Sequence, residues 1–472
     1  MHAKSVAGRR IVSNKVLGYY EGSMDFSAPF AGKKITVMGL GLLGRGIGDA
    51  AFLAEAGAEL TVTDLKTETQ LANSIAALAA YPNVRFVLGE HRLEDFEGRD
   101  MILVAAGVPM DSPYLAHARA AGVRLAQSAA LFAELSKVPM IGITGTRGKS
   151  TTTAMIAHII ETVTGGQVIR GGNIRGVSNL QLLKEVRDDS LAVFELDSWQ
   201  LQGFGWAGIS PQIAVFTTFM DDHLNYYKGD IDAYFADKAN IFINQDDDGV
   251  LITTPDVFAR AQRFATNRSI TLGQEVVLVD ESMIPEDAVL SMPGAHNRLN
   301  AALALAACRS LSLSDEEIFD ALASFPGVEG RLQLVPTQDG VRIYNDNNAT
   351  TPQATIAGLT ALDSGAHTIV LIAGGADKAI DVAPLADAIR AHCKAVVLLP
   401  GSGTDRLLPL MGDVVASVQP DLAQALAEAR RQAVSGDIIL FSPAFASFGL
   451  FVNEYDRNDQ FMALIEDAQT AV

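Results

Sequence analysis

Short apolar, β-branched segments alternate with helical patterns along most of the chain. In the first half these segments lie at 34–38, 60–63, 101–105, 140–144 and 191–196, and each is followed by turn residues or the start of a helix. The same alternation returns at 368–373, 395–399 and 437–441. Strands that alternate with helices predict parallel sheets joined by crossover helices, so we expect an α/β fold.

The pattern divides into three blocks. The first ends near residue 127, and the segment Phe325-Pro326-Gly327 marks a break between the second block and the third. A proline and glycine pair of this kind is typical of a boundary between elements. We therefore predict domains at 1–127, 128–327 and 328–472.

The charge balance is strongly acidic. The 472 residues include 36 Lys and Arg against 55 Asp and Glu, a formal net charge of −19. This balance argues against non-specific binding to nucleic acid or to an anionic membrane. A phosphate ligand remains possible because local backbone amides can bind it. With only two cysteines, the chain offers neither a disulfide framework nor a cysteine-based zinc site.

The apolar segments are all short. None approaches the roughly 20 residues that a membrane-spanning helix needs. Residues 1–27 contain basic side chains but no continuous apolar core, so they do not resemble a signal peptide. We expect a cytoplasmic protein without a membrane span.

A glycine-rich turn follows the first predicted strand. Gly39-Leu40-Gly41-Leu42-Leu43-Gly44 opens a helix, and Asp64 follows 20 residues later at the end of the next strand. This spacing is the dinucleotide-binding fingerprint, in which small residues permit a tight turn and helix amides face a pyrophosphate. From these residues alone, NAD, another phosphate-bearing nucleotide and a glycine turn without ligand all remain open.

The strongest local motif is Gly142-Ile143-Thr144-Gly145-Thr146-Arg147-Gly148-Lys149-Ser150, between the strand 140–144 and a helix expected at 151–160. Ile143 stands where the usual P-loop has its first glycine, so a shorter Thr-Gly-Thr-x-Gly-Lys-Ser form remains. The amides of such a loop cradle phosphate oxygens, Lys149 can balance phosphoryl charge and Ser150 can bind magnesium. These residues predict an ATP phosphate site.

Acidic and imidazole side chains follow this loop at strand ends. Glu195 lies in the strand 191–196, and His223 follows the apolar segment 213–217. With a hydroxyl they would suit magnesium, although Glu195 alone could equally form an ion pair and His223 could be an ordinary loop histidine. Lys238, in a helical stretch, has by itself the pattern of a surface lysine.

Further polar groups lie later in the chain. Asn297 and Asn300 precede an alanine-rich helix expected at 301–307, where they could contact a base or ribose, or cap the helix. Three polar loops at 344–352, 374–378 and 442–447 follow strands of the third block. The carboxyl ends of parallel strands are where such sheets bind ligands, so the three loops together predict a site.

Taken in order, these motifs resemble the Mur ligase family, over nearly the whole chain after Gly32. The resemblance is carried by 142–150, Gly171-Gly172-Asn173-Ile174, Glu195-Leu196-Asp197-Ser198-Trp199-Gln200-Leu201, Asp222-His223, His296-Asn297-Arg298-Leu299-Asn300, Asn345-Asp346 through Thr350, and Ser442-Pro443-Ala444 through Ser447. It implies a Rossmann-like N-terminal domain that binds a UDP substrate, a P-loop-type central ATPase domain and a Rossmann-like C-terminal domain that binds an amino acid.

The resemblance also implies residue roles. UDP rather than NAD would contact Leu42, Leu43, Asp64, Gly107 and Asn173. ATP would contact Gly145, Thr146, Gly148, Lys149, Ser150, Thr151, Asn297, Asn300, Arg331 and Asp346. Magnesium would be held by Ser150, Glu195, His223 and Lys238, with Lys238 carrying a carbamate. The catalytic residues would be Lys149, His223 and Lys238, and glutamate would contact Thr350, Lys378 and Ser447.

The implied reaction is ATP-dependent addition of D-glutamate to UDP-N-acetylmuramoyl-L-alanine through an acyl phosphate, in peptidoglycan precursor synthesis. We expect a monomer that acts on small molecules. Asn347-Asn348 replaces a common Ser-Lys pair, Glu454 replaces an aromatic residue, and Arg147 and Asp197-Ser198-Trp199 also depart from the usual pattern. L-glutamate or another amino acid therefore remains an alternative, as does a non-catalytic nucleotide-binding regulator. Folylpolyglutamate synthetase and a NAD oxidoreductase explain fewer of the motifs.

Overall fold

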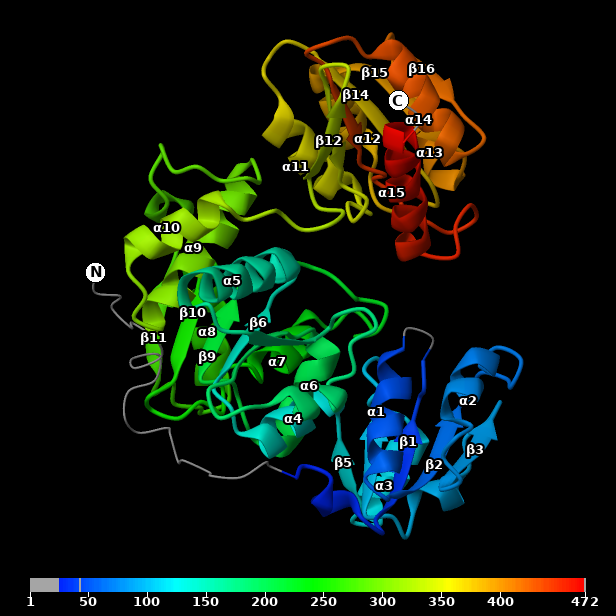
Figure 1. Ribbon diagram of the computed structural model, residues 1–472, viewed down its shortest axis with the longest axis vertical. Helices are drawn as coiled ribbons and strands as arrows, with labels where there is room; N and C mark the ends of the chain where they lie inside the picture. Colours follow the sequence, from blue (N-terminus) through cyan, green and yellow to red (C-terminus); the bar gives the residue numbers. More distant parts are fainter. Residues whose placement is uncertain (1–24, 42–43, 471–472) are drawn as a thin grey trace. The chain divides into compact units, whose positions relative to one another are not determined.

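The computed structural model describes residues 25–41 and 44–470, so the predicted contacts Leu42 and Leu43 lie outside the described residues. The chain forms two compact units. The first holds the residues up to 283 together with 300–321, and the second holds 284–299 and the residues from 322 onward. The first unit contains two sheets and the second unit contains one (Figure 1).

The first sheet is parallel and has the order β3-β2-β1-β4-β5. The strands are β1 (Lys34–Met38), β2 (Glu59–Asp64), β3 (Val84–Leu88), β4 (Met101–Val104) and β5 (Arg124–Ala126), joined through α1 (Arg45–Glu55), α2 (Ala72–Leu78), η2 (Leu93–Phe96) and α3 (Pro113–Ala120). Strand β1 is buried at every position after Lys34, as expected for a strand with helices on both faces. The strand order reverses between β1 and β4, which is where sheets of this type bind ligands.

The second sheet is also parallel, with the order β11-β10-β9-β6-β8-β7. Its strands are β6 (Met140–Thr144), β7 (Val168–Gly172), β8 (Leu191–Glu195), β9 (Ile213–Phe216), β10 (Val250–Thr253) and β11 (Glu275–Leu278). The helices of this part are α4 (Ser128–Ser136), α5 (Lys149–Thr164), α6 (Ser198–Ala207), α7 (Ile231–Ala239), α8 (Pro255–Asn267), α9 (Ala295–Ser310) and α10 (Asp315–Ala323). Strand β6 lies at the centre of the sheet, so the loop after it faces its carboxyl edge.

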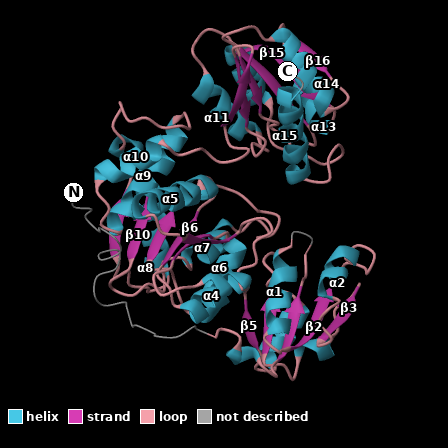
Figure 2. Cartoon of the chain, in the orientation of Figure 1, coloured by secondary structure: helices cyan, strands magenta, loops and turns pink. Residues whose placement is uncertain are grey.

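The third sheet has the order β12-β13-β17-β14-β15-β16, and only β12 runs antiparallel to its neighbour. Its strands are β12 (Gln333–Gln338), β13 (Val341–Asn345), β14 (Ile369–Gly374), β15 (Cys393–Leu399), β16 (Val415–Val418) and β17 (Ile438–Phe441). Helices α11 (Pro352–Leu362), α12 (Ala383–His392), α13 (Ser402–Leu407), α14 (Leu422–Gln432) and α15 (Glu454–Thr470) accompany them. Figure 2 shows the strands of each sheet flanked by helices.

The predicted α/β fold with parallel sheets in three domains is confirmed. The helix expected at 151–160 runs over Lys149–Thr164, and the alanine-rich helix begins at Ala295 rather than at 301. Asn297 and Asn300 therefore lie within α9, and a role as its N-cap is wrong. Both cysteines are free, as expected, and both are buried. Among the described residues, no helix is long and apolar enough to cross a membrane.

Candidate active site

Two glycines shape the loop between β6 and α5. Gly145 has φ +144°, and a Cβ there would collide with the Thr217 hydroxyl. Gly148 has φ +86°, and a Cβ there would collide with the side-chain oxygen of Asn300. The backbone turns directly from Gly148 into α5, whose first N–H groups have no intrahelical acceptors. This is the setting in which a helix N-terminus binds phosphate.

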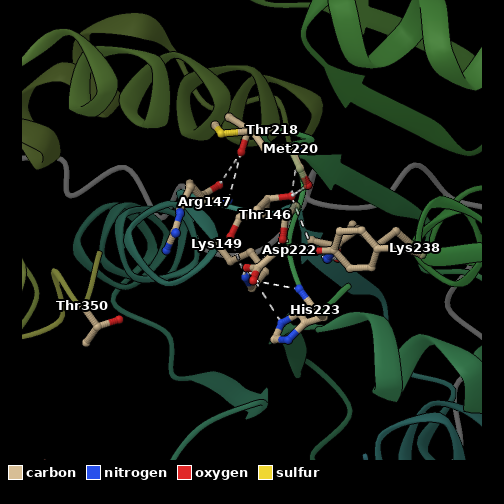
Figure 3. A network of polar contacts seen from close by, with 12 residues as sticks. Thr146, Arg147, Lys149, Thr218, Met220, Asp222, His223, Lys238 and Thr350 are labelled. Atoms are coloured by element: carbon tan, nitrogen blue, oxygen red, sulfur yellow. Dashed lines mark hydrogen bonds and ion pairs between the residues drawn. The ribbon is translucent and has the colours of Figure 1, made fainter. Parts of the chain in front are cut away.

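The segment after β9 holds this loop in place (Figure 3). The N–H groups of Thr146 and Arg147 donate to the carbonyl and hydroxyl oxygens of Thr218, at 2.8 and 2.9 Å. The Thr146 hydroxyl accepts from the Met220 N–H at 3.0 Å and donates to the Met220 carbonyl at 3.2 Å. Thr146 therefore braces the loop that leads into α5, whose first turn contains Ser150 and Thr151.

Two lysines converge on the same carbonyl oxygen. The Nζ of Lys149 lies 3.1 Å from the Gly145 oxygen and 3.3 Å from the Thr146 oxygen. The Nζ of Lys238 lies 2.9 Å from the Gly145 oxygen and 3.4 Å from the Thr144 hydroxyl. Lys238 is only 1% exposed, so its sequence-only interpretation as a surface lysine is wrong. Burial, and then the charge of Lys149, hold the pKa of Lys238 well below its ordinary value.

The predicted carboxylate, Glu195, and the predicted imidazole, His223, also lie at the carboxyl edge of the second sheet. Glu195, at the end of β8, is 7% exposed, and its carboxylate forms no hydrogen bond or ion pair with any residue that the structure describes. The His223 N–H donates to Asp222 Oδ1 at 2.9 Å, and the His223 ring lies 4.7 Å from the Trp199 ring. Burial lowers the pKa of His223, while the charge of Asp222 acts in the opposite direction.

The potential metal-binding side chains of this site suit magnesium that is bound together with a nucleotide. No three His, Cys, Asp or Glu side chains of the described chain lie close enough to form a complete metal site. The unpartnered, buried Glu195 carboxylate is nevertheless an oxygen donor beside the phosphate loop, in electrostatic reach of Lys238. Magnesium in nucleotide sites typically takes one or two protein ligands and completes its shell with phosphates and water. The residues present therefore fit this ion.

Asn300 links α9 to the first turn of α5, because its side-chain oxygen accepts from the Thr152 hydroxyl at 3.4 Å. Asn297 lies three residues earlier on the same helix and donates to the Pro293 carbonyl at 2.9 Å. The sequence thus correctly places the two amides at helical spacing.

The first sheet has a pocket at the carboxyl ends of β1, β2 and β4. Its volume is about 590 Å³, and Asp64 and Gly107 both line it. The Asp64 carboxylate accepts from the N–H groups of Leu40 and Lys66, each at 2.9 Å. Asp64 therefore fixes the glycine turn and also reaches the pocket. Asn173, after β7, accepts from the Arg45 guanidinium at 2.7 Å, which joins it to the start of α1.

Three loops meet at the carboxyl edge of the third sheet. Lys378 Nζ donates to the Thr350 hydroxyl at 3.0 Å, and Ala376 exchanges two backbone hydrogen bonds with Ala446, next to the buried Ser447. The structure thus brings the loops of the three predicted glutamate contacts together.

The buried Asp346 lies in the same unit. Its carboxylate accepts from the Ser442 hydroxyl at 2.8 Å and from the Leu332 N–H at 3.1 Å. Burial raises the pKa of Asp346 to about 7, and the charge of Arg331 opposes this rise. The predicted pair Arg331 and Asp346 is therefore in electrostatic contact.

Sequence reasoning missed Arg457, in the first turns of α15. This side chain is 0% exposed, and its guanidinium donates to the Asn347 side-chain oxygen at 2.8 Å, the Asn347 carbonyl at 3.0 Å and the Phe445 carbonyl at 3.3 Å. It therefore ties the loop after β13 to the loop after β17. A single arginine in a largely polar helix gives no local signal of burial.

Three Mur ligase domain families match successive parts of this chain. Residues 33–127 match the N-terminal domain described as Mur ligase MurD-like, 143–308 match the Mur ligase middle domain, and 330–445 match the Mur ligase glutamate ligase domain. The UDP-N-acetylmuramoylalanine–D-glutamate ligase of Roseiflexus sp. is 39% identical, over 92% of this chain and 99% of that protein. This chain belongs to the Mur ligase family.

Other Mur ligases agree with this assignment. The UDP-N-acetylmuramoylalanine–D-glutamate ligase of Borreliella burgdorferi (strain ZS7) is 33% identical, with 91% of this chain and 97% of that protein covered. The crystal structure of UDP-N-acetylmuramate-alanine ligase from Thermotoga maritima has a TM-score of 0.58 at 18% identity, with 93% and 100% covered. MurF ligase from the same organism, in complex with ADP, has a TM-score of 0.56 at 15% identity, with 93% and 96% covered. At such identities the two structures show a shared fold.

Proposed function

We propose that this protein is an ATP-dependent ligase that joins D-glutamate to UDP-N-acetylmuramoyl-L-alanine and releases ADP and phosphate, a step of peptidoglycan precursor synthesis. The observation that carries the proposal is the identity of 39%, over nearly the full length of both chains, with a relative named for this reaction. The phosphate loop, with its two lysines and the unpartnered Glu195, supports ATP chemistry in this chain.

The reaction would proceed in two steps. A carboxylate oxygen of the UDP-linked substrate attacks the γ-phosphorus of ATP, the bond to the bridging oxygen breaks, and ADP leaves. The amine of glutamate then attacks the carbonyl carbon of the acyl phosphate, loses a proton, and phosphate leaves as the peptide bond forms. Two anions must approach in the first step, so positive charge at Lys149 and the amides of α5 would supply most of the stabilisation.

The residues divide between three substrates. The pocket with Asp64 and Gly107, together with Asn173, would take the UDP substrate. The phosphate loop from Gly145 to Thr151, with Asn297, Asn300, Arg331 and Asp346, would take ATP. Thr350, Lys378 and Ser447 would take glutamate. Domain boundaries at 127 and 327 would separate the three sheets from one another.

Magnesium would be held by Ser150, Glu195, His223 and a carbamate on Lys238, and it would neutralise phosphate charge. The Lys238 amine is buried, and its hydrogen-bond acceptors are a carbonyl and a hydroxyl rather than a carboxylate. Addition of carbon dioxide to the unprotonated amine, with loss of one proton, would form a carbamate anion that can bind the metal.

L-glutamate is the second candidate, because two departures lie at the proposed amino-acid site. The Asn347 side chain donates to the Glu454 carbonyl at 2.9 Å, and the Asn348 side chain donates to the Glu329 carbonyl at 3.2 Å. An amide at 348 in place of a lysine removes one positive charge near Thr350, and Glu454 adds a negative charge to the start of α15.

The proposal is tested by product formation. Purified protein is incubated with ATP, magnesium, UDP-N-acetylmuramoyl-L-alanine and D-glutamate, and the products are analysed by mass spectrometry. We expect a product heavier by one glutamyl residue, and we expect none when any one component is omitted. ATP binding without product from either glutamate isomer would contradict the proposal and favour a nucleotide-binding regulator.

A further inference from the structure

Two loops that follow strands of different sheets meet in the first compact unit. The first loop, residues 107–111, comes after β4 and lines the pocket of about 590 Å³ at the edge of the first sheet. The second loop, residues 222–229, comes after β9 and carries His223. The function proposed above assigns His223 to magnesium but gives no role to the residues that follow it.

Tyr226 joins the two loops by a hydrogen bond. Its hydroxyl donates to the Val108 carbonyl at 3.1 Å and accepts from the Gln202 side-chain nitrogen at 3.3 Å. A phenol has one hydrogen and a carbonyl oxygen can only accept, so the direction of the bond to Val108 is fixed. Gln202 is buried, and its nitrogen also donates to the Asp237 carboxylate at 2.7 Å. Tyr226 therefore connects the loop 107–111 to side chains of α6 and α7.

The Tyr226 ring is held by two aromatic neighbours. It packs edge-to-face against Trp199 at a centroid distance of 5.4 Å and against Tyr227 at 4.9 Å. The Trp199 ring also lies 4.7 Å from the His223 ring, and a Cβ on Gly107 would lie 3.9 Å from the indole. The indole therefore contacts the histidine, the tyrosine and the loop that lines the pocket.

The backbone links Tyr226 to His223 through one tight turn. The His223 carbonyl accepts from the N–H groups of Tyr226 and Tyr227, at 2.9 and 3.1 Å. His223 has φ +52°, a left-handed conformation that is uncommon for residues other than glycine. Such a conformation persists only where the surrounding contacts hold it, and it is concentrated at ligand sites. A change in the position of His223 would therefore also move the Tyr226 hydroxyl and the loop 107–111.

A second contact between the two loops is a surface ion pair. The Nζ of Lys228 lies 2.6 Å from Asp111 Oδ2, and the two side chains are 77% and 65% exposed. Ion pairs with this exposure contribute little and are weakened by salt. The hydroxyl bond of the half-buried Tyr226, which continues to the buried Gln202, is therefore the main link between the loops.

We propose that Tyr226 is a positioning residue through which the binding of ATP with magnesium and the binding of the UDP-linked substrate support each other. This inference rests on the proposed function, which places ATP at the phosphate loop and the nucleotide of the substrate in the pocket. A ligand that holds His223 in place also fixes the Tyr226 hydroxyl and the wall of the pocket, so the second ligand meets a site that is already ordered. Such coupling is reciprocal, because each ligand changes the affinity for the other by the same factor.

The test measures this coupling factor by isothermal titration calorimetry. UDP-N-acetylmuramoyl-L-alanine is titrated into the full-length protein, first alone and then with magnesium and a saturating β,γ-methylene analogue of ATP, whose γ-phosphoryl group is not transferred. We expect the analogue to tighten substrate binding by at least about fivefold, the lower end of typical couplings between sites. The reverse titration, of the analogue with and without the substrate, should give the same factor.

Tyr226→Phe keeps the ring against Trp199 and Tyr227 but removes the hydroxyl. The coupling factor should fall below about twofold, while the affinity for each ligand alone changes by less than about threefold. A purely structural role would weaken both ligands or lower the thermal stability, and it would leave the factor unchanged. Tyr81→Phe is the matched control, because it removes a hydroxyl that donates to Glu55 at 2.6 Å outside both loops. It should keep the wild-type factor.

The possible outcomes separate the inference from the proposed function. A wild-type coupling factor near one, or a factor that Tyr226→Phe leaves unchanged, would overturn the inference alone. An equal loss of the factor in Tyr81→Phe would likewise overturn the role given to Tyr226. Failure of the wild-type protein to bind UDP-N-acetylmuramoyl-L-alanine would overturn the inference together with the UDP part of the proposed function.

Discussion

The side-chain nitrogens of Lys149 and Lys238 share one acceptor, the carbonyl oxygen of Gly145, at 3.1 and 2.9 Å. Two like charges on one carbonyl repel each other, and Lys238 is also buried, so its charged form is disfavoured. A phosphate beside Lys149, or an anionic carbamate on Lys238, would relieve this repulsion. The shared acceptor therefore favours an anion beside Lys149 or on Lys238.

Lys149→Ala removes the cation of the phosphate loop. We expect kcat to fall by at least about 100-fold, since loss of one preorganised charge contact typically has this effect. The variant should keep its fold, which circular dichroism and thermal unfolding can check. Lys33→Ala, which removes a surface lysine paired with Asp100, is the control and should keep full activity. Near-normal turnover of Lys149→Ala would remove this lysine from the mechanism.

Lys238→Ala tests the carbamate. We expect loss of activity, and partial recovery when acetate or formate is added, because a small carboxylate can occupy the space of the missing group. Lys149→Ala serves as the control, since a carboxylate cannot replace its positive charge. Activity should be measured over a range of acid concentrations at constant ionic strength. A folded Lys238→Ala protein that no acid restores would argue that Lys238 acts as an amine.

The arrangement of the phosphate site could largely be predicted from the sequence. The sequence placed Lys149 and Ser150 directly before a helix, which in the structure begins at Lys149, and it placed Glu195 near the end of a strand, β8, which pairs with β6. The burial of Lys238 could not be predicted, because its position on α7 shows no local difference from a surface lysine. Only the tertiary fold, which packs α7 against the carboxyl edge of the second sheet, shields Lys238 from solvent.

Arg457→Met removes a buried cation that holds two loops together. Three acceptors, two on Asn347 and one on Phe445, would lose their donor. We expect the free energy of unfolding to fall by about 2–4 kcal/mol, since each buried acceptor left unsatisfied costs about 1–3 kcal/mol. Urea denaturation followed by fluorescence measures this loss.

Arg431→Met is the matched control, because its guanidinium pairs with Glu428 at the surface of α14. It should change the free energy of unfolding by less than about 1 kcal/mol. An equal effect of the two substitutions would contradict the structural role given to Arg457.

Asp346→Asn tests the buried carboxyl group. Its pKa of about 7 in the folded protein lies above the ordinary value of 3.8, so the protonated form is favoured in the fold. This contribution to stability is complete below pH 3.8 and is lost as the pH rises through 7. An asparagine does not titrate, so the variant does not lose this stability as the pH rises. The asparagine can also keep the contacts with Ser442 and Leu332.

The variant should therefore gain stability relative to the wild type as the pH rises from 4 to 8. The gain should reach about 4 kcal/mol, from roughly three pKa units at about 1.4 kcal/mol each. Denaturant unfolding of both proteins at several pH values measures this difference. A difference that stays constant with pH would show that the Asp346 carboxyl has an ordinary pKa.

Contacts between distant parts of the chain could not be predicted from the sequence. His91 follows a strand that was not predicted, β3, and its ring contacts the hydroxyl of Thr63, 28 residues earlier. The contacts of Arg457 likewise join α15 to a loop 110 residues before it. Such pairs come from the crossover topology of the sheets, which brings distant strand ends to one edge.

The most direct test of the central claim is phosphate release from ATP in the presence of magnesium and UDP-N-acetylmuramoyl-L-alanine, with D-glutamate and L-glutamate compared side by side. We predict release with D-glutamate and little above background with L-glutamate. Release with the L-isomer alone would contradict D-glutamate as the substrate while keeping the ATP site. No release with either isomer would contradict the assignment of this chain as a glutamate ligase.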